Sequence, residues 1–299
     1  MTPATPTTPR PLRRLRSLLF VPAQVPRFVA RAAERGADAV VLDLEDSVPE
    51  AERPAARAGL PAALAALAAA GTCAVLARPN RPLLDLARDL EAAVRPGLAG
   101  LVLPKAEDAA WVREVSSAVA ALETARGMEP GGVRLVLQVE TPAALLALPA
   151  ICAADPRVAA VTLGPEDLSA ALGAEPSPEL LGGPTLALVA AARAAGVVPL
   201  GLPGPIGEFS DLDAYAALVA AARRVGVRGS LCVHPAQVPV LNAGFAPGGA
   251  ELAWARRALA AEAEALARGR AAWTVDGRMG DPPVARRARE IVALSGEEA

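Results

Sequence analysis

Eight short apolar runs, mostly of β-branched and other aliphatic residues, recur along the chain. They are Leu18–Val21, Ala39–Leu44, Cys73–Ala77, Gly100–Leu103, Val133–Val139, Val158–Leu163, Val197–Leu202 and Ser230–Val233. Each run is nearly continuous in hydrophobicity, which is the pattern of a parallel strand that is buried on both faces. The pattern therefore predicts eight buried strands.

Segments rich in Ala, Leu, Arg and Glu separate most of these strands and are long enough for helices. Examples are Pro26–Arg35, Arg53–Ala70, Ala109–Arg126, Pro142–Ala153, Pro184–Ala195 and Leu212–Val225. Repeated strand–helix alternation predicts an α/β fold with a parallel sheet, and eight repeats favour closure into a (β/α)8 TIM barrel. A doubly wound open sheet is the alternative. It normally carries a glycine-rich loop after its first strand, but residues 21–26 contain no glycine.

The chain divides into three predicted parts. Residues 1–14 are rich in Thr, Pro and Arg and read as a disordered lead, and residues 15–246 form the barrel. Residues 247–299 form a C-terminal helical extension: a helix over Pro247–Gly269, a turn-rich loop over Trp273–Pro283 and a helix over Val284–Leu294. Because a closed barrel does not need these elements, we expect them to cover its open end or to pack on a neighbouring subunit.

Composition narrows the class of protein. The length of 299 residues fits one barrel, which typically has roughly 250 residues. The net charge of −2 indicates no nucleic-acid partner, and no apolar stretch approaches the roughly 20 residues that span a membrane. The three cysteines, Cys73, Cys152 and Cys232, lie in apolar stretches without a CxxC pattern. We expect them to be buried thiols of a cytoplasmic protein, with a disulfide as the alternative.

Charged residues follow the predicted strands, where barrel enzymes carry their active sites. Glu140 follows the fifth strand and Asp167 the sixth. Two carboxylates on adjacent strand ends, with room for water and substrate oxygens, suit Mg²⁺. The alternative is that each carboxylate caps the next helix. Taken together with Arg78 at the end of the third strand, metal binding is favoured.

Arg78 can hold a substrate carboxylate or thioester oxygen through two parallel hydrogen bonds. The alternative role is an ion pair with the acids after the second strand, Asp43, Glu45 and Asp46. We expect one of those acids to face the site and hold metal-bound water and another to bond Arg78, and the sequence does not say which.

Two further residues could carry other chemistry. His234, the single histidine, could be a general base, but the following Pro235 and Gln237 suggest a rigid turn in which it has a structural role. Lys105 could form a Schiff base, although the carboxylates would then have no function. A single histidine excludes zinc or di-iron sites that need several.

Several motifs occur in the order found in one known family. They are Arg16–Pro22, Gly36–Ser47, Leu103–Lys105, Glu140–Thr141, Leu163–Leu168, Val233–Gln237 and Asp276–Asp281. On these motifs the chain resembles the citrate lyase beta subunit and malyl-CoA lyase group of the HpcH/HpaI aldolase superfamily, from about residue 15 to residue 294.

The resemblance implies a homo-oligomer, a trimer or a hexamer, with Mg²⁺ on Glu140 and Asp167 and with Arg78 holding the substrate. It implies that Asp281 enters a neighbouring subunit's site as the acid or base. Phe20 and Arg31 match positions that contact coenzyme A in malyl-CoA lyases, and Lys105 and the three acids after the second strand would support the site. The chain departs from the family pattern at Pro79, at Pro203, where relatives have an acid, and at Ser230, where they usually have lysine.

The implied activity is that of a carbon–carbon lyase: reversible Claisen-type cleavage of a 3-hydroxyacyl-CoA thioester such as malyl-, citramalyl- or citryl-CoA. Its ligands would be the CoA thioester and a small 2-oxo or hydroxy acid. Three alternatives stay open: a thioesterase for malyl-CoA-like esters, a metal-dependent aldolase for 4-hydroxy-2-oxo acids, and a non-catalytic subunit that binds acyl thioesters.

Overall fold

The eight apolar runs form eight strands in the computed structural model, which describes residue 12 and residues 14–296. They are β1 (Ser17–Pro22), β2 (Ala39–Asp43), β3 (Ala74–Arg78), β4 (Gly100–Leu103), β5 (Arg134–Val139), β6 (Val158–Leu163), β7 (Val198–Leu200) and β8 (Ser230–Cys232). Nearly every residue of these strands is buried, as expected for strands covered on both faces. The lead predicted over residues 1–14 lies outside the described residues, apart from residues 12 and 14.

The strands form one parallel sheet in the order β7-β6-β5-β4-β3-β2-β1-β8. β1 pairs with both β2 and β8, so the last strand of the chain returns to the first. At the remaining seam, the backbone N–H of Arg228 donates to Pro199 O and that of Gly201 donates to Gly229 O, each over 2.9 Å. These contacts bring the sheet to a nearly closed barrel, which confirms the TIM-barrel prediction over the open sheet.

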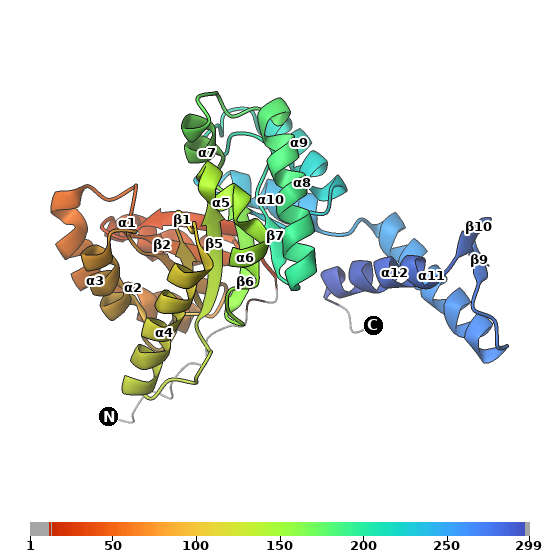
Figure 1. Ribbon diagram of the computed structural model, residues 1–299, viewed down its shortest axis with the longest axis horizontal. Coiled ribbons are helices and arrows are strands. Elements are labelled where there is room, and N and C mark those ends of the chain that lie inside the picture. The colour runs from red at the N-terminus through yellow and green to blue at the C-terminus, as the bar shows by residue number, and fades with distance from the viewer. Residues whose placement is uncertain (1–11, 13, 297–299) are drawn as a thin grey trace. The chain divides into compact units, whose positions relative to one another are not determined.

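Helices lie along the outside of the strands (Figure 1). They are α1 (Pro26–Ala32), α2 (Arg53–Ala70), α3 (Leu83–Ala93), α4 (Ala109–Ala125), α5 (Pro142–Leu146), α6 (Leu148–Cys152), α7 (Pro165–Ala171), α8 (Pro178–Ala195), α9 (Leu212–Arg224) and α10 (Gln237–Phe245), with 3-10 turns at Ala33–Arg35 and Glu50–Glu52. Because each helix returns the chain to the starting end of the next strand, the carboxyl ends of all eight strands share one face.

Two predicted helices differ from the structure. The helix predicted from Pro184 begins at Pro178, where the Ser177 side chain accepts from the N–H of Leu180, and Pro184 lies inside it. Ser at the N-cap followed by Pro at the first helical position is a strong helix start, so the helix begins at Pro178. Pro184 is then an interior proline that the packed structure tolerates. The helix predicted over Pro142–Ala153 is divided into α5 and α6 at Ala147.

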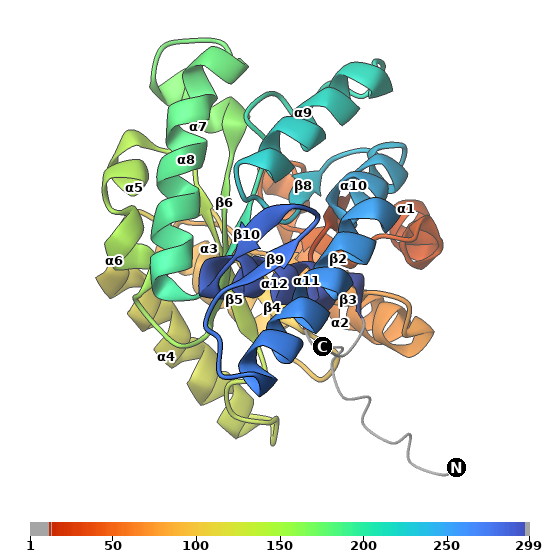
Figure 2. The ribbon, with the colours of Figure 1, turned by 90° about the vertical axis from the view of Figure 1, so that its right-hand side faces the viewer.

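Residues Gly244–Ala299 form a second compact unit. It contains α11 (Gly249–Ala267), β9 (Trp273–Val275), β10 (Arg278–Gly280) and α12 (Pro282–Ser295), and β9 and β10 pair as an antiparallel hairpin (Figure 2). The loop predicted over Trp273–Pro283 is therefore wrong. Asp276 and Gly277 both have positive φ, 49° and 76°, as the tight turn of a hairpin requires. Ala255 and Ala258 of α11 pack against Ile291 and Val292 of α12.

The three cysteines are buried and free, as predicted. No helix within the described part of the chain is long and apolar enough to cross a membrane.

Candidate active site

A cavity of about 400 Å³ lies at the carboxyl ends of the strands. Its lining residues come from strands β1, β2, β3 and β5 and from the segments that follow β2, β5, β6, β7 and β8: Phe20, Pro22, Asp43, Asp46, Ser47, Arg78, Gln138, Glu140, Gly164, Glu166, Asp167, Ile206, Gly207 and Val233. Most of the charged residues predicted from the strand ends therefore meet in one place.

Asp43 and Arg78 form the most tightly held pair of the site. They are register partners on the neighbouring strands β2 and β3, so their side chains meet across the ladder. Arg78 Nε and Nη2 each donate to Asp43 over 2.7 Å, and both side chains are buried. Burial would raise the pKa of Asp43, but the hydrogen bonds and charge of Arg78 outweigh it and hold that pKa below its usual value.

The rest of the Arg78 guanidinium is also engaged. Nη1 lies 3.1 Å from Glu45 and 3.3 Å from Asp46, and the ring of Phe20 lies beneath the guanidinium carbon at 4.3 Å. Asp46 is half-exposed, whereas Glu45 is buried. Arg78 is therefore paired with all three acids after β2 and also lines the cavity, and Asp46 is its most exposed partner.

Glu140 is buried and lines the cavity. Its carboxylate accepts a hydrogen bond from the backbone N–H of Lys105 over 2.9 Å and another from the Gln138 side chain. Gly164 lies directly against it, since a Cβ at that position would be 2.5 Å from Glu140 Cγ. Glycine at 164 is therefore required by the close approach of the Glu140 side chain.

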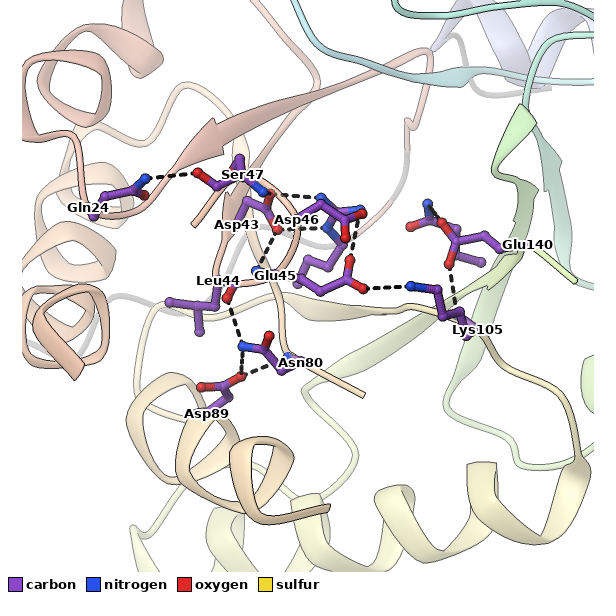
Figure 3. Close-up of polar contacts among 12 residues, drawn as sticks. Gln24, Asp43, Leu44, Glu45, Asp46, Ser47, Asn80, Asp89, Lys105 and Glu140 are labelled. Atoms are coloured by element: carbon purple, nitrogen blue, oxygen red, sulfur yellow. Dashed lines mark hydrogen bonds and ion pairs between the residues drawn. The ribbon is translucent and has the colours of Figure 1, made fainter. Parts of the chain in front are cut away.

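Lys105 contacts both Glu140 and Glu45 (Figure 3). It has a φ of 49°, a conformation that costs a non-glycine residue about 1–2 kcal/mol, and that backbone directs its N–H to Glu140. Its amine lies 3.3 Å from Glu45. Burial would lower the pKa of Lys105, but Glu45 outweighs it and raises that pKa. A Schiff-base nucleophile needs a neutral amine, so this environment disfavours that role.

Asp167 lies in the first turn of α7, is exposed, and faces the cavity beside Glu140. Burial raises the pKa of Glu140 to about 8, and the charges of Glu45 and Asp167 add to this effect. The pKa of Glu45 is likewise raised by burial, to about 7. Carboxylates whose ionisation is opposed in this way are stabilised by a cation placed among them.

The donor set fits a hard divalent cation held by few protein ligands. Within residues 14–296, no three His, Cys, Asp or Glu side chains are arranged as a complete metal-binding group. Glu140 and Asp167 offer two carboxylates, and the buried Oε1 of Gln138, which lines the same cavity, has no hydrogen-bond partner among the described residues. Mg²⁺ commonly takes one or two carboxylates and completes its octahedron with water and substrate oxygens, so the cavity meets its requirement.

A second polar network holds the end of β3 in place (Figure 3). The buried Asp89 of α3 accepts from the backbone N–H and the side-chain amide of Asn80, and that amide also donates to Leu44 O. This network ties the residues after β2 to those after β3, and thereby supports the Asp43–Arg78 pair.

Three predicted residues lie elsewhere. Arg31 is exposed on α1 and is not a lining residue. Asp281 lies in the second unit, where its side chain accepts from Val284 N and caps α12. His234 stacks on Phe209 with ring centroids 4.3 Å apart, and its Nδ1 accepts from Ala236 N, which favours the structural role. The roles proposed for Arg31 and Asp281 stay predictions.

Sequence reasoning missed several lining residues. Gln138 lies near the end of β5, two positions before Glu140, and in extended backbone residues two apart point to the same side, so that spacing could have found it. Glu166 belongs to the family motif Leu163–Leu168, but the sequence suggested no role for it. Ile206 and Gly207 follow β7 and carried no chemical signal.

Comparison with known proteins gives consistent results. The family described as HpcH/HpaI aldolase/citrate lyase matches residues 16–235. A citrate lyase subunit beta-like protein of Mycobacterium tuberculosis is 34% identical over 297 residues, covering 93% of this chain and 95% of that protein. The L-malyl-CoA/beta-methylmalyl-CoA lyase of Rhodobacter capsulatus is 31% identical over 313 residues, covering 95% of each.

Solved structures agree with these relatives. The crystal structure of the protein CitE from Mycobacterium tuberculosis in complex with magnesium, acetoacetate and coenzyme A matches with a TM-score of 0.73 and 32% identity, covering 96% of this chain and 100% of that chain. The citrate lyase beta subunit from the same organism, complexed with oxaloacetate and magnesium, matches with a TM-score of 0.63 and 31% identity over 79% of this chain and 99% of that chain.

Proposed function

Since this chain belongs to the HpcH/HpaI aldolase/citrate lyase family, we propose that it is a Mg²⁺-dependent carbon–carbon lyase that cleaves a 3-hydroxyacyl-CoA thioester to a 2-oxo acid and an acyl-CoA. The relatives named citrate lyase subunit beta and malyl-CoA lyase are lyases. Malyl-, citramalyl- and citryl-CoA are the proposed substrates.

One observation carries the proposal: Glu140, Asp167 and Arg78 come from three different strand ends and line a single cavity. Two carboxylates that would hold a cation stand in the same cavity as a guanidinium that would bind a carbonyl or carboxylate oxygen. This is the arrangement needed to stabilise negative charge that develops during cleavage of a carbon–carbon bond.

In the proposed reaction the substrate hydroxyl gives up its proton to solvent, and its C–O bond becomes the carbonyl of the 2-oxo acid. The bond between that carbon and the α-carbon of the thioester breaks. The electron pair passes into the thioester as an enolate, which is then protonated at carbon. Mg²⁺, held by Glu140 and Asp167, would supply Lewis-acid stabilisation of the substrate oxygens. Arg78 is fixed by Asp43 along one edge, so we propose that a substrate oxygen takes the place of the exposed Asp46 at Nη1.

The proton at the enolate carbon requires an acid or base near the cavity. We propose Asp281 of a second copy of the chain for this step, within a homotrimer or hexamer. Supporting this choice, Asp281 caps α12 in a separate compact unit, which is a suitable carrier for a residue supplied to a neighbour. Phe20 of the cavity and Arg31 of α1 remain the proposed contacts for coenzyme A.

The test is product formation from L-malyl-CoA, citramalyl-CoA and citryl-CoA, with and without Mg²⁺. We expect wild type to release acetyl-CoA and a 2-oxo acid in a reaction that depends on Mg²⁺. We expect Asp167→Ala to lose this activity. Asp213→Ala is the matched control, because Asp213 is also an exposed acid in the first turn of a helix but lines no part of the cavity.

Each other result has a definite meaning. Release of free CoA without acetyl-CoA would identify a thioesterase. Equal activity of Asp167→Ala and wild type would refute the metal site. Absence of cleavage for all three esters, with Mg²⁺ still bound at Asp167, would refute the proposed substrate class and favour a subunit that only binds acyl thioesters.

A further inference from the structure

The segment between β7 and α9, residues 203–210, forms one wall of the cavity and is called here the wall segment. Ile206 and Gly207 face the cavity, and the neighbouring Val233 adds to the same apolar side. Arg78, Glu140 and Asp167 line the same cavity. The wall segment therefore limits the space for the apolar part of a bound acyl group.

Glu166 holds this wall from the cavity side. Its Oε1 accepts two backbone hydrogen bonds, one from Ile206 N over 2.8 Å and one from Gly207 N over 3.0 Å. Glu166 belongs to the first turn of α7, next to Asp167. One carboxylate thus connects the helix that carries Asp167 to the two wall residues that face the cavity.

Gln237 holds the same segment from the other side. Its Nε2 donates to Ile206 O over 2.7 Å and to Glu208 O over 3.3 Å, and its Oε1 accepts from the backbone N–H groups of Val233 and His234. Gln237 is completely buried, whereas Glu166 is exposed. The backbone of Ile206 is consequently fixed at both its N–H and its carbonyl, and Glu166 is the anchor that can be changed without disturbing the core.

A role as a helix cap is less well supported by the geometry of Glu166. A helix cap would accept from the N–H groups of α7 itself, but both hydrogen bonds of Oε1 go to the wall segment.

Resting on the proposed function, we propose that Glu166 is a positioning residue that anchors the wall segment and thereby sets affinity for the acyl part of the substrate. The group required is a hydrogen-bond acceptor at Oε1, and its negative charge is secondary. Glu166→Gln retains an oxygen acceptor in the same place, whereas Glu166→Ala removes it.

The experiment compares Glu166→Ala, Glu166→Gln and the control Glu175→Ala, an exposed acid on the connection between α7 and α8. Amide hydrogen exchange is measured on the unliganded protein. Binding of oxaloacetate with Mg²⁺ is measured by calorimetry. KM and kcat are measured with whichever of malyl-, citramalyl- and citryl-CoA the wild type cleaves fastest. The exchange measurement does not depend on any activity, so it separates failure of the anchor from failure of the proposed function.

We expect faster exchange at Ile206 and Gly207 in Glu166→Ala, with Val233 and His234 unchanged because Gln237 still holds them. We expect KM and the oxaloacetate dissociation constant to rise about tenfold, which corresponds to about 1.4 kcal/mol, with kcat within threefold of wild type. Glu166→Gln should restore both, and Glu175→Ala should match wild type.

Three results would overturn the proposal. The first is unchanged exchange at Ile206 and Gly207 in Glu166→Ala. The second is a fall in kcat with KM and the dissociation constant unchanged, which would place Glu166 in the chemistry. The third is a Glu166→Gln variant as weak as Glu166→Ala, with lost Mg²⁺ affinity, which would show that the charge acts at the metal.

Discussion

Replacing Gly164 with alanine tests the metal site without removing any of its ligands. The added Cβ would lie 2.5 Å from Glu140 Cγ and 2.7 Å from its Oε1. Carbon atoms in contact are normally about 3.5–4.0 Å apart, so the overlap is about 1 Å. The backbone of Gly164 has φ −99° and ψ 96°, which alanine adopts nearly as easily, so the effect is one of packing and not of backbone strain.

The overlap must be relieved by the Glu140 side chain. Gly164 is held by its own N–H, which donates to Val139 O over 2.9 Å, and by its carbonyl, which accepts from Leu168 N over 3.0 Å. A shift of Glu140 weakens its hydrogen bonds from Lys105 N and Gln138. Overpacking of this kind costs about 1–3 kcal/mol, and we expect Gly164→Ala to lower the free energy of unfolding by that amount.

Calorimetric titration with Mg²⁺ is the decisive assay, together with urea unfolding. We expect Mg²⁺ to bind at least about tenfold more weakly to Gly164→Ala, since the carboxylate is displaced. In a Glu140→Ala background the same substitution should cost little stability, so the double-mutant cycle should give a coupling energy of about 1–3 kcal/mol. Gly183→Ala is the control, because no atom lies within 4 Å of its added Cβ and Gly183 does not line the cavity.

Wild-type Mg²⁺ affinity and unchanged stability of Gly164→Ala would refute this reasoning. An equal loss of stability in the Glu140→Ala background would show that the clash involves some other group, and the assignment of Gly164 to the support of Glu140 would be wrong.

Three further predictions follow from individual contacts. Arg78→Lys replaces the two-bond contact with Asp43 by a point charge, so kcat should fall on the order of 10²–10³-fold while calorimetry shows Mg²⁺ still binding; near-native turnover would contradict the role of Arg78. Because the folded state keeps the proton of Glu140 up to a pKa of about 8, whereas an unfolded glutamate releases it near ~4.3, stability without Mg²⁺ should fall as pH rises from ~5 to ~8, and added Mg²⁺ should reverse that fall. Urea unfolding at pH ~5.5 and ~8.5 checks this. In a Glu140→Gln variant the free energy of unfolding should depend less on pH, because residue 140 no longer titrates. Gly59→Ala, at an exposed position of α2 with no atom within 4 Å of the new Cβ, should raise the free energy of unfolding by about 0.5–1 kcal/mol in the same assay; a destabilised variant would contradict the helical placement.

The local pattern of the chain was sufficient to predict the strands. A strand buried on both faces must be apolar throughout, so β2, β3 and β6 are visible as continuous runs, and each predicted boundary lies within two residues of the observed one. Short-range signals also determine turns, and the hairpin in the second unit was missed only because the Asp276-Gly277 pair was not read as a hairpin turn.

The candidate site could be predicted as a set of strand-end residues, because parallel strands bring their carboxyl ends to one face. The sequence by itself therefore determined the fold class, the motifs of the family and the candidates Glu140, Asp167 and Arg78. It left open which acid after β2 bonds Arg78, because three acids in four residues look equivalent along the chain.

Only the tertiary structure decided among those acids. The register of β2 and β3 places Asp43 opposite Arg78, buries Glu45 between Arg78 and Lys105, and leaves Asp46 half-exposed. The same holds for Glu166 and Ile206, which lie 40 positions apart and meet through a side-chain to backbone hydrogen bond. Contacts of this kind depend on distances between distant segments, and the order of residues carries no local signal for them.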